Sequence, residues 1–151
     1  MSVGEICTRN TVVASEDTSV AAVARLMREH HVGSVVIVKA SGTRRKPVGI
    51  ITDRDLVVAV MATDIDAERV AVGDAMSFDL VTVKDQDDVW DAIQIMRAKG
   101  VRRIPVVDGG GDLAGILSVD DVLDFLAGVL SDLVRLINRE QSRETRKRAA
   151  L

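Results

Sequence analysis

Two short motifs place a hydroxyl and a carboxylate where they could do chemistry together. Thr52 and Asp55 follow a Gly-Ile-Ile run, and Ser118 and Asp121 follow a Gly-Ile-Leu run. The spacing is that of a capping box, in which the hydroxyl accepts a hydrogen bond from a helix amide and the carboxylate reaches back. The same groups could bind a ligand, because a helix N-terminus attracts phosphate and a carboxylate accepts hydrogen bonds from ribose hydroxyls. Both interpretations stay open at this point.

The two motifs belong to an internal repeat. The segment from Val3 to Thr8 matches the segment from Val72 to Ser77, which lies 69 positions later. The offset shortens to 66 at the motif glycines, so the first copy carries extra loop residues. Self-similarity of this kind indicates two copies of one structural unit. We expect a first repeat over 1–62, a linker over 63–71, a second repeat over 72–130 and a C-terminal helical extension over 131–151.

Each copy has the same order of predicted elements. Val20, Val23 and Met27 are spaced three or four residues apart, which places them on one face of a helix. The β-branched runs at 35–38 and 48–51 are typical of buried strands. In the second copy, the glycines of 108–112 favour a tight turn. Each repeat is therefore predicted as strand, helix, strand, strand, helix.

These motifs resemble a known family. The phrases Gly49–Leu56 and Val101–Asp108 are similar to those of the cystathionine-β-synthase (CBS) domain pair, or Bateman module, and the similarity covers roughly residues 3–130. It implies an α/β fold of two tandem β-α-β-β-α repeats packed with pseudo-twofold symmetry, followed here by an extended C-terminal helix. It also implies a flat homodimer and a regulatory rather than a catalytic role.

The resemblance assigns ligand-binding positions in two clefts. Asp55 and Asp121 would bind ribose, Thr52 and Ser118 would bind ribose or phosphate, and Arg54 matches a position that faces phosphate in some relatives. The strand before the first helix and the segment leading into the next strand would contact the base and phosphate. These positions are Val12, Val32, Gly33 and Ser34 in the first copy and Val81, Val101, Arg102 and Arg103 in the second.

The two copies differ in positive charge. Arg102 and Arg103 supply planar, permanently charged groups suited to phosphate, whereas the first copy has Gly33 and Ser34 there. The first copy would need Arg54, or the two arginines reaching across the pseudo-twofold axis, for its phosphate charge. We therefore rank the Ser118/Asp121 cleft first. The alternative is that both arginines are solvated charges at an exposed strand end.

Composition narrows the classes of function. The net charge is −3, with one tryptophan, two phenylalanines and no tyrosine, so the sequence offers neither a basic field nor stacking platforms for nucleic acid. No run is apolar enough to cross a membrane, and no secretion signal is recognisable. A single cysteine, Cys7, fits a reducing cytoplasm. We expect a cytoplasmic protein without membrane contact.

No catalytic or metal-binding constellation is recognisable in the sequence. His30 and His31 are adjacent, so they point about 100° apart on a helix and do not chelate as an i, i+4 pair could. The acidic residues between 85 and 91 suit the positive end of a helix. Cys7 takes the position of Met76 in the second copy and is expected in a core or linker. The basic loop over 39–46 is expected to be solvated.

Leu126, Leu130, Leu133 and Ile137 continue one helical stripe beyond the repeats, and a basic end follows over 139–148. The apolar part favours packing, as in a dimer. The basic end is typical of a soluble helix terminus, or of contact with an acidic partner, nucleic acid included.

The leading hypothesis is a non-catalytic regulatory module with no required cofactor. It would bind an adenosine nucleotide (AMP, ADP or ATP) between the repeats, and a regulated protein whose identity the sequence does not give would read the change in shape. An alternative of a different class is a ligand-free dimerisation or docking module. A third is binding of S-adenosylmethionine, a dinucleotide or nucleic acid.

Overall fold

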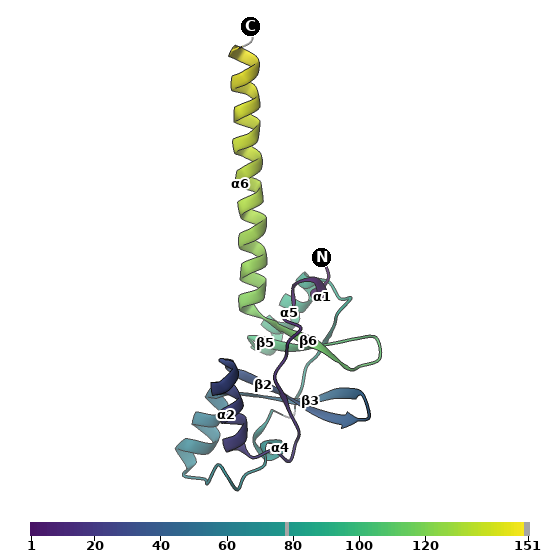
Figure 1. Cartoon of the computed structure of the whole chain (residues 1–151), viewed down its shortest axis with the longest axis vertical. Helices are drawn as coiled ribbons and strands as arrows, with labels where there is room; N and C mark the ends of the chain where they lie inside the picture. The colour runs from purple at the N-terminus through teal and green to yellow at the C-terminus, as the bar shows by residue number, and fades with distance from the viewer. Residues whose placement is uncertain (78, 150–151) are drawn as a thin grey trace.

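The computed structural model describes residues 1–77 and 79–149, and it consists of two three-stranded sheets and a long helix that leaves the second sheet (Figure 1). In the first sheet the order is β1 (Val13–Ala14), β2 (Ser34–Ser41) and β3 (Arg44–Thr52). In the second sheet the order is β4 (Val83–Lys84), β5 (Arg103–Val107) and β6 (Leu113–Ser118).

The two sheets have the same topology and register. The first strand of each runs parallel to the second, and the second pairs antiparallel with the third. Ser34 faces Thr52 in one sheet, and Arg103 faces Ser118 in the other. Even the irregularity recurs, after Ile37 in β2 and after Val106 in β5. The predicted α/β fold of two tandem repeats is confirmed.

The first long helix of each repeat is also matched. α2 (Val20–His30) and α5 (Val89–Lys99) both have 11 residues. The Ser19 hydroxyl accepts from the Ala22 amide at the start of α2, and the Asp88 carboxylate accepts from the Trp90 amide at the start of α5. α2 ends at His31 with φ 53°, the left-handed conformation that Gly100 adopts after α5. His31 is thus a helix-end residue, as the sequence predicts.

The last helices of the two repeats differ. In the first repeat, α3 (Asp53–Asp55) passes into the π-helical turn η1 (Leu56–Val60) and the 3-10 turn η2 (Met61–Thr63). In the second, α6 (Val119–Ala149) is one continuous helix of 31 residues, which confirms the predicted C-terminal extension. None of the helices in the described part of the chain combines the length and the apolar character that a bilayer crossing requires.

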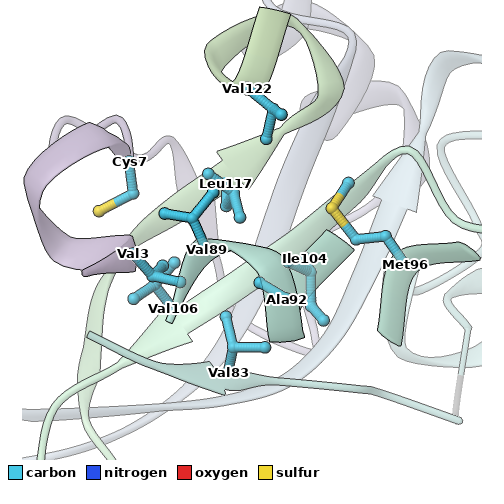
Figure 2. Close-up of a cluster of buried hydrophobic side chains, with 10 residues drawn as sticks. All are labelled: Val3, Cys7, Val83, Val89, Ala92, Met96, Ile104, Val106, Leu117 and Val122. Carbon is cyan, nitrogen blue, oxygen red and sulfur yellow. The ribbon is translucent and has the colours of Figure 1, made fainter. Parts of the chain in front are cut away.

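Two one-turn helices that the sequence analysis did not anticipate connect the repeats. α1 (Val3–Ile6) starts the chain, and α4 (Val72–Ala75) follows the linker. Each packs into the core of the opposite repeat. Figure 2 shows α1 contributing Val3 and Cys7 to the second core, beside Val83, Val89, Ala92, Met96, Ile104, Val106, Leu117 and Val122. The first core takes Val72 and Met76 in return, beside Ala14, Val23, Met27, Val35, Ile37 and Ile51.

The exchanged segments explain why each motif begins with a glycine. Thr8 and Ile116 exchange two backbone hydrogen bonds of 2.9 Å, so the N-terminal segment runs directly over β6. A Cβ on Gly115 would lie 2.8 Å from the Thr8 carbonyl oxygen and 2.9 Å from Cys7 Sγ. A Cβ on Gly49 would overlap the side chain of Met76, which holds the same place on β3. Only glycine lets the crossing segments approach this closely.

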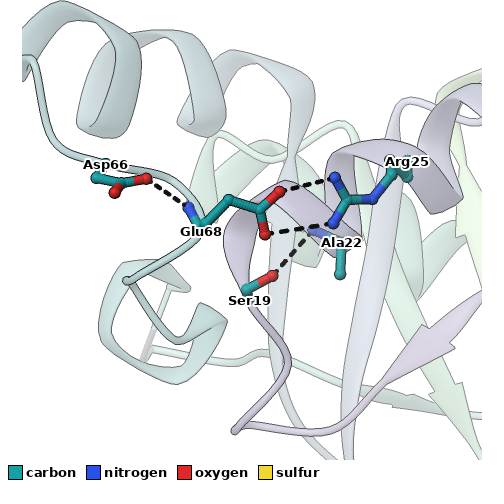
Figure 3. A network of polar contacts seen from close by, with 5 residues as sticks. All are labelled: Ser19, Ala22, Arg25, Asp66 and Glu68. Carbon is teal, nitrogen blue, oxygen red and sulfur yellow. Dashed lines mark hydrogen bonds and ion pairs between the residues drawn. The ribbon is translucent and has the colours of Figure 1, made fainter.

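The linker between the repeats is attached to α2 (Figure 3). The Arg25 guanidinium donates to both carboxylate oxygens of Glu68, at 2.8 and 3.3 Å, and the Glu68 amide donates to Asp66 Oδ1 at 3.0 Å. Hydrogen bonding and the charge of Arg25 lower the pKa of Glu68. Both side chains are more than half exposed, so the ion pair positions the linker and adds little stability.

One basic residue of the exposed first hairpin loop also contacts the other repeat. Arg44 reaches from the first hairpin to the second, where its Nε lies 3.0 Å from Asp112 Oδ2 and its Nη2 donates to the Gly110 carbonyl at 2.8 Å. The two hairpin loops project to the same side of the molecule, which brings these groups into range (Figure 1). Because Arg44 and Asp112 are far apart in the sequence, the sequence analysis did not predict this contact between the repeats.

Candidate functional site

Both hydroxyl and carboxylate motifs form closed capping boxes. Asp121 Oδ2 accepts from the Ser118 amide at 2.7 Å and from the Ser118 hydroxyl at 2.5 Å, while the Asp121 amide donates back to Ser118 Oγ at 3.1 Å. Asp55 Oδ2 accepts from the Thr52 amide and hydroxyl at 2.8 Å each, and its amide donates to Thr52 Oγ1 at 3.3 Å. The capping interpretation is therefore correct for both motifs, and it leaves the second oxygen of each carboxylate available.

The second oxygen of Asp121 already has one weak partner. The Thr8 hydroxyl, on the crossing N-terminal segment, donates to Asp121 Oδ1 at 3.2 Å. This bond is longer than the usual 2.7–2.8 Å for a hydroxyl donor. A ligand hydroxyl could therefore displace Thr8 at low cost while the capping box keeps the carboxylate in place.

A cleft of ≈ 240 Å³ opens beside this carboxylate and is built from both repeats. We call it the Asp121 cleft. The second repeat supplies the capping box and Arg103, and the first supplies the segments before β1 and β2. Its lining residues are Thr8, Asn10, Thr11, Val12, His31, Val32, Gly33, Ser34, Arg103, Ile116, Ser118, Asp120 and Asp121.

A second cleft of ≈ 230 Å³ lies at the equivalent place in the other repeat, and we call it the Val81 cleft. Its lining residues are Ile50, Ser77, Asp79, Leu80, Val81, Lys99, Val101, Arg103 and Pro105. The two clefts are pseudo-symmetric, because Thr8, Val12 and Val32 of one correspond to Ser77, Val81 and Val101 of the other at the repeat offset.

The structure distributes the expected ligand-binding residues over three places. The Asp121 cleft holds Val12, Val32, Gly33, Ser34, Ser118 and Asp121, and the Val81 cleft holds Val81 and Val101. Arg103 lines both clefts. Thr52, Arg54, Asp55 and Arg102 line neither. The side chains of Arg54 and Arg102 are exposed, which for Arg102 matches the alternative of a solvated charge at a strand end.

This grouping differs from a grouping by sequence copy. Gly33 and Ser34 of the first copy meet the motif of the second copy, because the chain crosses from one repeat to the other at Thr8. The guanidinium of Arg103 is the group that reaches across: its Nη2 lies 3.5 Å from the position of a Cβ on Gly33, next to the Asp53 carboxylate. Arg103 alone thus supplies the positive charge that the sequence analysis expected from Arg102 and Arg103 together.

The sequence analysis missed six residues of the Asp121 cleft, namely His31, Ile116 and Asp120 and three that precede Val12: Thr8, Asn10 and Thr11. The hydroxyl of Thr11 is buried and has no hydrogen-bond partner among residues 1–77 and 79–149. A buried hydroxyl without a partner costs about 1–3 kcal/mol, so this atom favours a ligand that offers it a polar group. The sequence did contain a signal for Thr8, Asn10 and Thr11. They lie in the segment before Val12, which corresponds to residues 77–80 at the repeat offset.

The two clefts differ in polarity. At the position of Asn10 and Thr11, the Val81 cleft has Asp79 and Leu80, so it lacks the unpaired hydroxyl and gains a carboxylate. Among the described residues of the Asp121 cleft, Arg103 is the one permanent cation, and it stands against two carboxylates. The Asp121 cleft is therefore suited to the many hydroxyls of a sugar and to little phosphate charge.

Neither a thiol nucleophile nor a metal cluster accompanies the clefts. Burial raises the pKa of the Cys7 thiol, so it stays protonated in the second core. Across 1–77 and 79–149, no three His, Cys, Asp or Glu side chains come close enough together to hold a metal ion.

The protein is one of a class of tandem α/β modules. Its defining features are the pair of repeats, the segments that they exchange and the clefts between them. The CBS domain family matches residues 3–62 and 72–128 of the chain, which therefore belongs to this family. The uncharacterized protein MK0525 of Methanopyrus kandleri is 40% identical over 143 residues, which span 93% of this chain and 71% of that protein.

Two similar solved structures hold nucleotides. The CBS domain protein PAE2072 from Pyrobaculum aerophilum, complexed with AMP, is 27% identical with a TM-score of 0.73, and the match covers 80% of this chain and 89% of that one. The cytosolic domain of the Mg²⁺ channel MgtE, in complex with ATP, is 29% identical with a TM-score of 0.69, covering 82% of this chain and 48% of that one.

Proposed function

We propose that the chain is a non-catalytic regulatory module that binds an adenosine nucleotide in the Asp121 cleft. The observation that carries this proposal is the set of groups gathered there from both repeats. Asp121 offers a fixed carboxylate oxygen to ribose hydroxyls, Thr11 offers an unpaired hydroxyl, and Arg103 offers a charge to phosphate. Val12 and Val32 supply apolar contact for a base. The AMP and ATP complexes of related chains support the same ligand class.

The charges of the cleft favour the smallest nucleotide. The one guanidinium offsets part of the charge of the single phosphate of AMP, whereas each further phosphate of ADP or ATP adds negative charge near Asp120 and Asp121. We expect affinity to fall from AMP through ADP to ATP. Arg103 lies on the boundary of the two clefts, so the phosphate would point toward the Val81 cleft and the ribose toward Asp121.

The size of the cleft suggests how binding is signalled. Its ≈ 240 Å³ is below the roughly 300–1,000 Å³ of most ligand pockets. A nucleotide would therefore have to widen the space between the repeats. Since α6 starts at the capping box of Asp121, this movement would be passed directly to the long helix or to a dimer interface. A regulated protein that contacts either one would sense the ligand.

The test is a thermal-shift and calorimetry panel with adenosine, AMP, ADP, ATP and S-adenosylmethionine. Bound at 100 times its dissociation constant, a ligand stabilises the fold by about 2.7 kcal/mol. Asp121→Ala should abolish the ligand-induced shift. Asp55→Ala is the matched control, because it removes the equivalent capping carboxylate outside both clefts and should keep the shift. Unchanged melting of the wild type across the panel would refute nucleotide binding.

A ligand-free docking module is the second candidate, and one observation favours it. Both motif carboxylates are satisfied as capping boxes without any ligand. This candidate predicts no response to the panel, together with loss of partner binding when residues 138–151 are deleted. We propose the flat homodimer and the cytoplasmic location expected from the sequence for either candidate function.

A further inference from the structure

The far part of α6 has an apolar face that nothing in the described part of the chain covers. Val122 is the one buried residue of this helix, near the end that meets β6 and α1. Beyond it the helix projects from the body (Figure 1) and extends for about 40 Å at 1.5 Å per residue. Large apolar side chains that are between 36% and 64% exposed follow along it: Leu123, Leu126, Val129, Leu130, Leu133, Val134, Leu136 and Ile137.

These side chains form one stripe rather than a scattered set. Leu123, Leu130 and Ile137 are seven residues apart, and Leu126 and Leu133 lie between them, which is the a and d pattern of a helix that packs against another helix. Val129, Val134 and Leu136 widen the stripe on both sides. An exposed apolar surface of this extent marks an interaction site. Most of it lies beyond residue 128, where the match to the family ends.

The charges of α6 are divided between its two halves. Residues 119–132 contain four aspartates and neither lysine nor arginine. Residues 133–149 contain six lysines and arginines against two glutamates. Two such helices attract each other when they run in opposite directions, because the acidic half of each then lies along the basic half of the other. Side by side in the same direction, like charges would meet.

We propose that α6 pairs antiparallel with α6 of a second copy of this chain. With Leu130 of one copy against Leu133 of the other, Leu126 of each faces Ile137 of the other, so the stripe covers itself. The same register puts Asp124 at the same level along the helix axes as Arg139 of the second copy. The proposal rests on the apolar stripe and the charge division alone, and does not depend on nucleotide binding.

The first test compares two double variants by sedimentation equilibrium of the full chain. Leu130→Asp with Leu133→Asp puts charges into the centre of the stripe and should weaken the association at least about 100-fold, halving the mass of the assembly. Gly128→Asp with Ser131→Asp adds the same charge on the polar side of the helix, where a Cβ on Gly128 meets nothing within 4 Å, and should leave the mass unchanged. A monomeric wild type, or equal masses for all three proteins, would overturn the proposal.

The second test measures direction with spin labels on Ser131→Cys or Gln141→Cys, since the buried Cys7 should not react. In the antiparallel pair, the two labels at 131 lie within about 20 Å of each other. The two labels at 141 are about 30 Å apart, because residue 141 of one helix lies opposite residue 122 of the other, 19 residues away from the second label. Short distances at both sites would mean a parallel pair, and distances beyond 50 Å at both would mean that α6 is not paired. Either result refutes the antiparallel arrangement.

Discussion

Replacing Gly115 by alanine tests the crossing of the N-terminal segment over the second repeat. The added Cβ would lie 2.8 Å from a backbone oxygen of Thr8 and 2.9 Å from Cys7 Sγ, so the segment has to move. Overpacking of this kind costs about 1–3 kcal/mol. The two backbone hydrogen bonds between Thr8 and Ile116 are strained by the same movement, at about 1 kcal/mol each. We expect a loss of about 3 kcal/mol in the free energy of unfolding.

Thermal and denaturant unfolding measure this loss directly. For a chain of 151 residues, about 3 kcal/mol corresponds to a fall in Tm of about 6–12 °C. Gly128→Ala is the matched control, because it makes the same substitution in the helix interior of α6 where no atom lies within 4 Å of the new Cβ. Alanine is the better helix former by about 1 kcal/mol, so the control should match or exceed the wild type. A Gly115→Ala variant that melts within 2 °C of the wild type would refute the described crossing.

Three further outcomes can be measured. Gly49→Ala should destabilise through overlap with Met76, and the addition of Met76→Val should recover part of the loss in unfolding experiments, whereas additive losses would contradict the contact. Arg103→Gln should weaken AMP binding about 10–100-fold by calorimetry, while Arg102→Gln, outside both clefts, should leave it unchanged. Burial raises the pKa of Cys7. The stability that its protonated thiol contributes is therefore fully present below the pKa of the unfolded thiol and is lost as pH rises through the folded pKa. Cys7→Ala should flatten that decline in the free energy of unfolding, measured by denaturant unfolding between pH 7 and 10.

The features that the sequence predicted correctly are local. The strands and the helices α2 and α5 follow from residue types and spacings within about ten positions, and the repeat showed that each copy had to adopt the same arrangement. The capping interpretation of Thr52 and Ser118 was also within reach, because a capping box is formed by neighbours in the chain.

The features that the sequence did not predict depend on contacts between distant parts of the chain. Nothing in the periodicity around Val3 says that its partner core lies eighty or more residues away. The consequence for the site is that Gly33 lines the Asp121 cleft of the other copy, while its carbonyl accepts a hydrogen bond from the Asp53 amide of its own copy. Arg102 and Arg103 are adjacent in a sequence that gives no sign of which one points into the clefts. Register within β5 decides this, because Arg103 pairs with Ser118 and Arg102 precedes the strand.

The exchange of α1 and α4 also determines the order in which the chain can fold as it is synthesised. The first core cannot close until Val72 and Met76 have been made. Val3 and Cys7 are made before the rest of the second core, yet their binding surface is complete only after Leu117 and Val122. The N-terminal segment must therefore wait, unpaired, for more than a hundred residues. Neither repeat is a unit that finishes folding alone, and the whole pair should fold and unfold in one cooperative step.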